Sequence, residues 1–410
     1  MEIDFPLESP DYVVDPHKTW KLLRENDPIH WVDKYNFWVV TKYDDLAEMA
    51  KLTTEFSSKI GPSGGIQETD YLPMIQDDPP DHTRLRSLVS RTFSPRRIET
   101  LETDIQAISD ALVSQIHDVA SSGDEFDFYQ LYASPLPVKV IALLLGVPEE
   151  FHERLRVWAE ATGIGSGEQY TPDQQITAMK EIGECLEEVI EQRRANPQDD
   201  LISAMAQVAD EDGEKLRADE LLGFCKLFWI AGNETTTNLL SNGAVLLQNR
   251  RDLIDRILSD PACLPSFVEE VLRFDSPVNG LFRSATTDVE YKGKKIKKGD
   301  ALWLLFASGN HDEEHFERPD EFIIDRHKND HMAFGRGIHF CAGAALARLE
   351  GKIGFYALAK LMKTGDVYPD RGRRIPTPVL RGWVSMPMKL QCQSFQHQSL
   401  LGQSHISHFS

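Results

Sequence analysis

The pattern of apolar and polar positions along the chain predicts a protein rich in helices. Apolar side chains recur at helical spacing between residues 176 and 194. The members of this stripe are Ile176, Met179, Ile182, Leu186 and Ile190. The longest helical pattern extends from about Ala218 to Gln248 and, at 1.5 Å per residue, is roughly 45 Å long. Its first half is apolar on all sides, so we expect that half to be buried.

Strand patterns are fewer and shorter. Residues 37–43 and 288–308 carry β-forming side chains around turn residues, and residues 59–67 have the composition of a loop. No internal repeat and no low-complexity linker divides the sequence. We therefore expect a mainly α fold with a smaller β-rich part, in the α+β class, as one domain over residues 1–390. The tail 391–410 is rich in Gln, Ser and His and has no acidic residue, so we expect it to be disordered.

The composition narrows the range of partners. The 410 residues are 41% hydrophobic and 27% charged, and the net charge of −21 disfavours binding to nucleic acid or to an anionic membrane surface. We see no signal peptide, and the longest apolar run, residues 140–147, is too short to cross a bilayer. The five cysteines are scattered, without a C-x-x-C pair, as is typical of a reducing compartment. These features predict a cytoplasmic protein without a membrane segment.

The candidate chemistry centres on residues 334–350, FGRGIHFCAGAALARLE, where a lone cysteine precedes a helix-forming run. Cys341 has His339 as its one close metal-ligand partner in the sequence, which is too few ligands for a structural zinc site. A nucleophilic cysteine and an inert buried cysteine are alternatives. However, the glycines of the loop leave room for a large flat group, and N–H groups at a helix start stabilise a thiolate. Such a thiolate is suited to be an axial ligand of haem iron.

This stretch resembles the cysteine loop of the cytochrome P450 family. The matching positions are Phe334, Gly335, Gly337, His339, Cys341, Gly343, Leu346, Ala347, Arg348 and Glu350. The resemblance covers roughly residues 11–390. It implies the cytochrome P450 fold, with heme b (iron protoporphyrin IX) between a long central helix and the cysteine loop, and it assigns Cys341 as the iron ligand. The further cofactor-binding residues that it implies in this loop are Phe334, Gly335, His339 and Gly343.

A polar patch interrupts the long helical pattern at AGNETTT, residues 231–237. Ser and Thr in a helix bond back to the carbonyl four residues earlier, so a bent helix with satisfied polar groups is one explanation. The patch also resembles the oxygen-binding helix of the cytochrome P450 family. That resemblance assigns Glu234 and Thr235 as an acid–alcohol pair that delivers protons to bound dioxygen, and it places Ala231 against the cofactor.

The motif EEVLR places Glu270 and Arg273 on one helix face. Exposed pairs of this kind are common, so the motif by itself is weak. In the family, such a pair forms a buried network beneath the cysteine loop with a later arginine, which FERPDEF supplies as Arg318. We assign these three residues to structural support.

The motif DPPDHTRLR places His82 and Arg86 four residues apart on one helix face. A solvated basic helix end is the alternative explanation. By resemblance these two residues contact the haem propionates, together with Arg283 in GLFRSAT and His339 in the cysteine loop. Carboxylate groups at such a site need arginine forks or histidine donors.

The residues that contact a substrate are less well defined. Four apolar positions, before Thr235 and after the EEVLR helix, are candidates for lining a substrate pocket. They are Leu227, Ile230, Val278 and Leu281. Simple core packing explains them equally well. The segment 59–75 is a candidate lid over the site.

The resemblance implies a haem-thiolate monooxygenase that activates dioxygen and hydroxylates a small apolar organic substrate. Since the sequence contains no flavin or iron–sulfur domain, we expect electrons from a ferredoxin and a ferredoxin reductase linked to NAD(P)H, and we expect a monomer. Candidate docking contacts in this acidic protein are Arg336, Arg96 and Arg97. The alternatives are a haem peroxygenase that uses peroxide directly and a non-catalytic haem-binding sensor. Terpenoid, steroid, fatty acid and polyketide substrates are all compatible with an apolar pocket.

Overall fold

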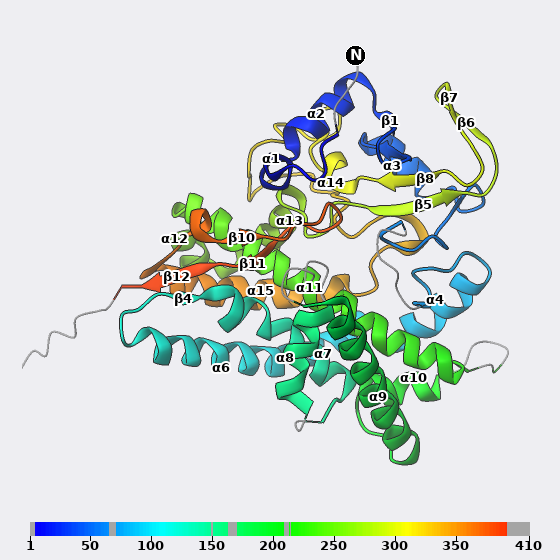
Figure 1. Cartoon of the computed structure of the whole chain (residues 1–410). Coiled ribbons are helices and arrows are strands. Elements are labelled where there is room, and N and C mark those ends of the chain that lie inside the picture. Colours follow the sequence, from blue (N-terminus) through cyan, green and yellow to red (C-terminus); the bar gives the residue numbers. More distant parts are fainter. Residues whose placement is uncertain are drawn as a thin grey trace, which may run out of the picture.

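The computed structural model of the chain describes residues 5–64, 71–148, 151–162, 170–208, 213 and 215–391. Helices fill most of the molecule, and the largest sheet lies at one end together with the N-terminal helices (Figure 1). The predicted mainly α fold with a smaller β-rich part is confirmed. The predicted tail, apart from its first residue, lies outside the described residues.

The α-helices follow one another along the whole described chain. In chain order they are α1 (Pro10–Val14), α2 (His17–Asn26), α3 (Tyr43–Met49), α4 (Asp81–Thr92), α5 (Pro95–Thr100), α6 (Glu102–Ala120), α7 (Pro135–Leu145), α8 (His152–Thr162), α9 (Pro172–Ala195), α10 (Leu201–Gln207), α11 (Ala218–Asn249), α12 (Asp252–Ser259), α13 (Leu264–Phe274), α14 (Phe306–Gly309) and α15 (Ala344–Met362). The short helical turns within the described residues are η1 (Tyr129–Ala133), η4 (Pro261–Cys263), η5 (Gly337–His339) and η6 (Pro369–Arg371). No helix within these described ranges is long and apolar enough to span a bilayer.

Helix α11 runs through the middle of the helical part (Figure 1). Its bounds agree with the predicted helix 218–248 to within one residue. Most of its side chains are buried, because α7 and α15 pack against it. Apolar residues of all three helices belong to the largest of three buried clusters, whereas the other two clusters include residues of the large sheet. The long helix is therefore the central element of the main core.

Helix α9 packs on α8, α10 and α11. Its start is fixed by a capping box, in which Thr171 Oγ1 accepts from the N–H of Gln174 and Gln174 Oε1 accepts from the N–H of Thr171. The later positions of the predicted apolar stripe are buried or half-buried, but Ile176 is 67% exposed. Burial along α9 starts at Ala178, beyond the first turn, so Ile176 belongs to the predicted stripe but lies outside the core.

Five strands form the largest sheet, in the order β1-β2-β8-β5-β3. They are β1 (Ile29–Val32), β2 (Phe37–Val40), β8 (Ala301–Leu304), β5 (Leu281–Ala285) and β3 (Phe56–Ser57). Strands β2 and β8 are parallel, and the other neighbours are antiparallel. The strand predicted over 37–43 ends at Val40, because the chain turns there and begins α3 at Tyr43.

The region predicted as strands over 288–308 forms a hairpin and then β8. The hairpin consists of β6 (Val289–Tyr291) and β7 (Lys294–Ile296), and it projects from the large sheet (Figure 1). Two small sheets made largely by the C-terminal part complete the fold, one in the order β4-β12-β9 and one that pairs β10 with β11. Their strands are β4 (Phe126–Asp127), β9 (Gly365–Val367), β10 (Arg373–Arg374), β11 (Trp383–Ser385) and β12 (Pro387–Leu390).

Candidate cofactor site

The cysteine loop is a tight backbone turn between residue 332 and the start of α15. Gly335 and Gly337 both have φ of +71°, a left-handed conformation that glycine adopts without strain. A Cβ at Gly337 would lie 2.5 Å from the backbone oxygen of Ala50, so the loop touches the chain just after α3. The N–H of Cys341 donates to the carbonyl of Phe334 at 2.9 Å and closes the turn. The backbone therefore fixes where the cysteine lies.

Cys341 is exposed, whereas the other cysteines in the described ranges are buried. Desolvation nevertheless raises the pKa of its thiol. A hydrogen bond from the backbone of Gly343 and the charges of Arg86 and Arg348 act in the opposite direction. The net increase differs from the lowered thiol pKa that a helix start favours, because desolvation outweighs these three contributions. A bound metal cation reverses that balance and deprotonates a coordinating thiol.

Four nitrogen-bearing side chains from three distant segments gather beside this loop. They are His82 and Arg86 on α4, Arg283 on β5 and His339 on η5. The rings of His82 and His339 lie 4.4 Å apart. Burial is the largest cause that lowers the pKa of each of the four groups, to about 10 for Arg283 and to about 2 for His339. The neighbouring charges of Arg283, His82 and Arg86 lower the pKa of His339 further, so the groups act on one another electrostatically.

His339 Nε2 lies 2.9 Å from the Oγ of Ser58, whereas the other three side chains have few partners within the described ranges. Arg283 Nη1 donates to the carbonyl of Phe282 at 2.7 Å, and Arg86 Nη1 contacts the sulfur of Met74 at 3.9 Å. His82 Nε2 is buried and has no described partner. Buried donors without acceptors are costly, so this cluster suits an anionic group. Two carboxylates of a flat cofactor, such as the propionates of haem, match that donor set.

The polar patch of α11 is helical throughout. Thr235 Oγ1 donates to the carbonyl of Ala231 at 2.8 Å, the bond to the carbonyl four residues earlier that the sequence suggests. Ala231 is exposed and Glu234 and Thr235 are half-buried, although the same helix buries Thr236 and its neighbours on other faces. Because residues three and four apart share a helix face, these three positions form one accessible face of a buried helix.

The predicted pair Glu270 and Arg273 lies on α13 and is fully buried. Arg273 Nε and Nη2 donate to the two carboxylate oxygens of Glu270 at 2.9 and 2.8 Å. Arg326 Nε approaches the same two oxygens at 3.2 and 3.1 Å, and Asn329 Nδ2 donates at 3.1 Å. The backbone N–H of Ile323 donates to Glu270 Oε1 at 2.9 Å, so the carboxylate is held by two arginines, a side-chain amide and a backbone amide.

The prediction that Arg318 belongs to this network is wrong. Its side chain is 57% exposed, and its Nη1 donates to Glu321 Oε2 at 3.0 Å on the surface. Arg318 has φ of +49°, and its backbone carbonyl accepts from Arg326 Nη2 at 3.2 Å. The backbone at this position therefore supports the network, while Arg326, which the sequence motifs did not reveal, supplies the second guanidinium.

A second ion-pair group connects α13 to the cysteine loop. Arg348 on α15 donates to both oxygens of Glu269 at 2.7 and 2.8 Å, and His331 Nε2 lies 3.1 Å from Glu269 Oε2. Burial raises the pKa of Glu269, but the hydrogen bonds and positive charges of Arg348 and His331 have the larger combined effect and lower this pKa to about 2. The guanidinium of Arg348 also lies 4.6 Å from the ring centre of Phe334. The adjacent acids of EEVLR thus have separate partners, which spacing in the sequence does not reveal.

The four candidate pocket residues differ in exposure. Leu227 is buried in the main core, as the core-packing alternative predicts, whereas Ile230, Val278 and Leu281 are half-buried. Val278 pairs with Leu380 in an isolated β-bridge, so the C-terminal segment, for which the sequence offered no signal, reaches the same region. Of the candidate lid, residues 65–70 lie outside the described residues.

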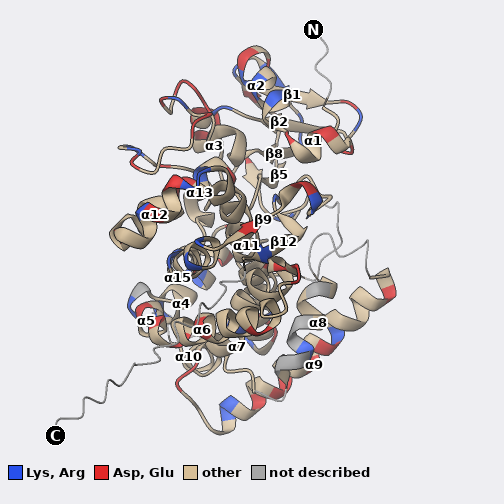
Figure 2. Cartoon of the chain, turned by 90° about the vertical axis from the view of Figure 1, so that its left-hand side faces the viewer, with Lys and Arg blue, Asp and Glu red and all other residues tan. Residues whose placement is uncertain are grey.

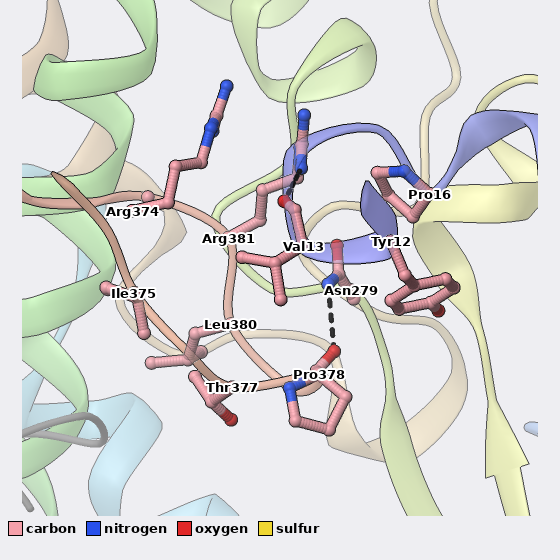
Figure 3. Close-up of a pocket in the computed structure, with 11 residues that line it drawn as sticks. Tyr12, Val13, Pro16, Asn279, Arg374, Ile375, Thr377, Pro378, Leu380 and Arg381 are labelled. Carbon is pink, nitrogen blue, oxygen red and sulfur yellow. Dashed lines mark hydrogen bonds between the residues drawn. The ribbon is translucent and has the colours of Figure 1, made fainter. Parts of the chain in front are cut away.

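A small cavity lies beside this C-terminal segment, between α1, the chain after α13 and residues 374–382 (Figure 3). Asn279 Nδ2 donates to the carbonyl of Pro378 at 2.8 Å across it, while Asn279 Oδ1 has no described partner. The head groups of Arg374 and Arg381 point away from Leu380 (Figure 3). The space has room for about one water molecule, so it is a packing feature behind the site and not a second ligand pocket.

Comparisons with known proteins agree with this geometry. The family model for Cytochrome P450 matches residues 170–391. Cytochrome P450 monooxygenase PikC from Streptomyces venezuelae is 35% identical over 396 residues, which cover 94% of this chain and 94% of that protein. The structure of cytochrome P450 CYP109Q5 from Chondromyces apiculatus has a TM-score of 0.87 at 31% identity and covers 96% of this chain and 100% of that one.

The structure of CYP109E1 from Bacillus megaterium in complex with corticosterone has a TM-score of 0.84 at 34% identity, and it covers 93% of this chain and 100% of that one. The family model spans more than half of this chain, and the relatives extend over nearly all of it. The predicted cofactor, heme b, is the cofactor of this family. The chain therefore belongs to the cytochrome P450 family of monooxygenases.

Proposed function

We propose that this cytochrome P450 is a haem-thiolate monooxygenase that hydroxylates a small apolar organic substrate with electrons from a ferredoxin and its reductase. The observation that carries the proposal is an exposed cysteine beside a buried cluster of nitrogen donors, together with an accessible acid–alcohol face on α11. When bound, haem supplies the binding and reductive activation of dioxygen. The residues of this chain hold the cofactor, position the substrate and move protons.

Cys341 would ligate the haem iron through its sulfur in this proposal. The hydrogen bond from the backbone of Gly343 and the positive charges of Arg86 and Arg348 stabilise negative charge on its sulfur. The side chains of His82, Arg86, Arg283 and His339 would hold the two propionates, and the buried Nε2 of His82 would gain the partner that it lacks within the described residues. Phe334 and Gly335 border the cofactor from the loop, and Ala231 does so from α11.

Thr235 and Glu234 would deliver protons from α11. The hydroxyl of Thr235 donates to the carbonyl of Ala231 at 2.8 Å, so its oxygen is held in place while its lone pairs remain free for a water molecule. Glu234, half-buried on the same helix face, is the acid that replaces the proton. Ile230, Val278 and Leu281 border the substrate, and the largely apolar steroid in complex with CYP109E1 supports an apolar pocket.

The test is the replacement Thr235→Ala, with Thr237→Ala as the matched control, since Thr237 makes the same bond to the carbonyl of Asn233 but is buried. We expect Thr235→Ala to keep consuming NAD(P)H and dioxygen while the product formed per NAD(P)H falls at least tenfold and peroxide rises. An unchanged yield in Thr235→Ala contradicts the proton-delivery role. Turnover with peroxide alone at the full rate favours the peroxygenase, and the absence of any NAD(P)H-linked product favours the sensor.

Corticosterone, the steroid in complex with CYP109E1, is the first probe of the substrate class. An apolar pocket predicts a spin-state change in the absorption spectrum on titration with corticosterone, and a weaker change with a charged conjugate of the same steroid. Equal responses to both compounds contradict the apolar pocket.

The redox partner is a ferredoxin that docks on the face of the cysteine loop. Arg96 is exposed on α5, and Phe340, next to Cys341, is 40% exposed. Arg97 Nη2 donates to Asp199 Oδ1 at 3.2 Å, so of the two predicted contacts on α5 we assign the docking role to Arg96. Acidic and basic segments are mixed along helices such as α8 and α9 (Figure 2), so a local basic contact is needed to orient an acidic partner. In this proposal the protein works as a cytoplasmic monomer, with one P450 domain over residues 1–390.

A further inference from the structure

Arg336, in the middle of the cysteine loop, points toward the protein instead of toward a docking partner. Its Nη2 donates to the hydroxyl of Tyr43 and to the backbone carbonyl of Asp330. Its side chain is 33% exposed, and its Nε is buried. A surface arginine that serves a partner keeps its guanidinium in solvent, whereas this one directs its donors to two internal acceptors.

The acceptor Tyr43 is itself held from several directions. Its N–H donates to Asp312 Oδ2 at 2.8 Å, and its ring stacks on that of His315 with 3.4 Å between the ring centres. Its hydroxyl donates to the carbonyl of Asp330 at 2.7 Å, and His315 Nε2 lies 2.9 Å from Asp330 Oδ1. Arg336 thus binds to a rigid point and not to a mobile side chain.

Two consecutive loop residues contact the two ends of α3. Arg336 reaches Tyr43, the first residue of that helix, and Gly337 lies against the carbonyl of Ala50, directly after its last residue. The bond from the N–H of Cys341 to Phe334 closes the loop around these two contacts. A shift of the backbone at residue 336 therefore moves the ends of the turn that carries the cysteine.

We propose that Arg336 is a positioning residue that fixes the cysteine loop on α3 and thereby keeps the sulfur of Cys341 in place as a thiolate ligand. This inference rests on the haem-thiolate ligation of the proposed function and replaces the predicted docking role of Arg336. The planar guanidinium satisfies a hydroxyl and a carbonyl at once, which a lysine ammonium does with poorer geometry.

The test compares Arg336→Ala and Arg336→Lys with Arg194→Ala in the haem-loaded protein. Arg194 is a matched surface arginine, 41% exposed on α9 and paired with Glu191 in its own helix. The reduced carbon monoxide complex reports whether the ligand is thiolate, through a strongly red-shifted Soret band. We expect Arg336→Ala to increase at least threefold the fraction that lacks this band, Arg336→Lys to increase it less, and Arg194→Ala to leave it unchanged.

A merely structural loss would lower the melting temperature without changing the ligand, so thermal unfolding is measured beside the spectra. If Arg336→Ala does not fold, Tyr43→Phe removes one acceptor, leaves the carbonyl of Asp330, and must show a smaller shift in the same direction. A wild-type spectrum in Arg336→Ala, with a weaker and less salt-dependent response to ferredoxin, overturns the proposal in favour of docking. A wild-type protein that shows the thiolate band but forms no product refutes the proposed function and leaves this inference standing.

Discussion

Replacing Arg326 by alanine tests which arginine completes the network around Glu270. The Glu270 carboxylate is fully buried, and Arg326, with a side chain only 6% exposed, contacts both of its oxygens. Arg326 also donates to three backbone carbonyls, those of Glu317, Arg318 and Glu321. The replacement takes one of two guanidinium groups from the buried carboxylate and removes the arginine donor of the Glu317 carbonyl. Arg273 still holds Glu270 and the carbonyl of Glu321, and the N–H of Glu321 still donates to the carbonyl of Arg318. Because Glu270 keeps Arg273 as a partner, we expect Arg326→Ala to lower the free energy of unfolding by about 1.5–3 kcal/mol, the contribution of hydrogen bonds to a charged group.

The control is Arg318→Ala, which removes a surface ion pair with Glu321 whose two side chains are more than half exposed. Pairs of this kind contribute about 0–1 kcal/mol, so we expect the free energy of unfolding of this variant to stay within about 1 kcal/mol of the wild-type value. Urea unfolding of both variants gives their free energies of unfolding relative to the wild type, provided that the dependence on urea concentration has the same slope in all three proteins. A loss in Arg318→Ala as large as that in Arg326→Ala would refute the assignment of Arg326 and restore the arginine expected from the motif.

Two further predictions concern buried ionisable groups. Burial raises the pKa of Glu350 well above its ordinary value of 4.5, and Glu350 Oε2 has no described partner. The folded protein then keeps a proton that the unfolded chain releases, so this group lowers stability by about 1.4 kcal/mol per pH unit above that ordinary value, up to its raised pKa. Glu350→Gln removes this titration, so the free energy of unfolding of the variant should increase relative to that of the wild type as pH rises from 5 to 7. Urea unfolding at several pH values measures both free energies, and a constant difference between them across this range would contradict the prediction. Arg283→Gln should weaken haem retention about tenfold to a hundredfold, the equivalent of one charged hydrogen bond of about 1.5–3 kcal/mol. The control Arg374→Gln should leave retention unchanged, since Arg374 is a half-buried arginine whose pKa is also lowered to about 10 but which lies outside the donor cluster. Transfer of haem to a stronger acceptor protein measures both, and equal loss in the two variants would contradict the propionate role of Arg283.

The sequence predicted those features that depend on local patterns. The bounds of α11 were predictable because its apolar surface and its length leave few alternatives, and the bond from Thr235 to Ala231 follows from the chemistry of a threonine within a helix. The cysteine loop was predictable because its glycines and its cysteine are needed at fixed positions.

Long-range pairing was not predictable in the same way. Arg318 and Arg326 lie eight residues apart in one loop, and the positive φ at Arg318 decides that its carbonyl and not its side chain faces Glu270. Arg336 was expected to face a partner because it is charged and lies in a loop, yet it is bound by Tyr43, about 290 residues earlier in the chain. Such contacts depend on how elements pack and leave no periodic signal in the sequence.

The central claim is that the sulfur of Cys341 ligates haem iron as a thiolate. The most direct measurement is the absorption spectrum of the dithionite-reduced protein with carbon monoxide, for the wild type and for Cys341→Ser. The account predicts a strongly red-shifted Soret band in the wild type that disappears in the variant. A purified wild-type protein that binds no haem, or a spectrum that is the same without Cys341, would contradict the account.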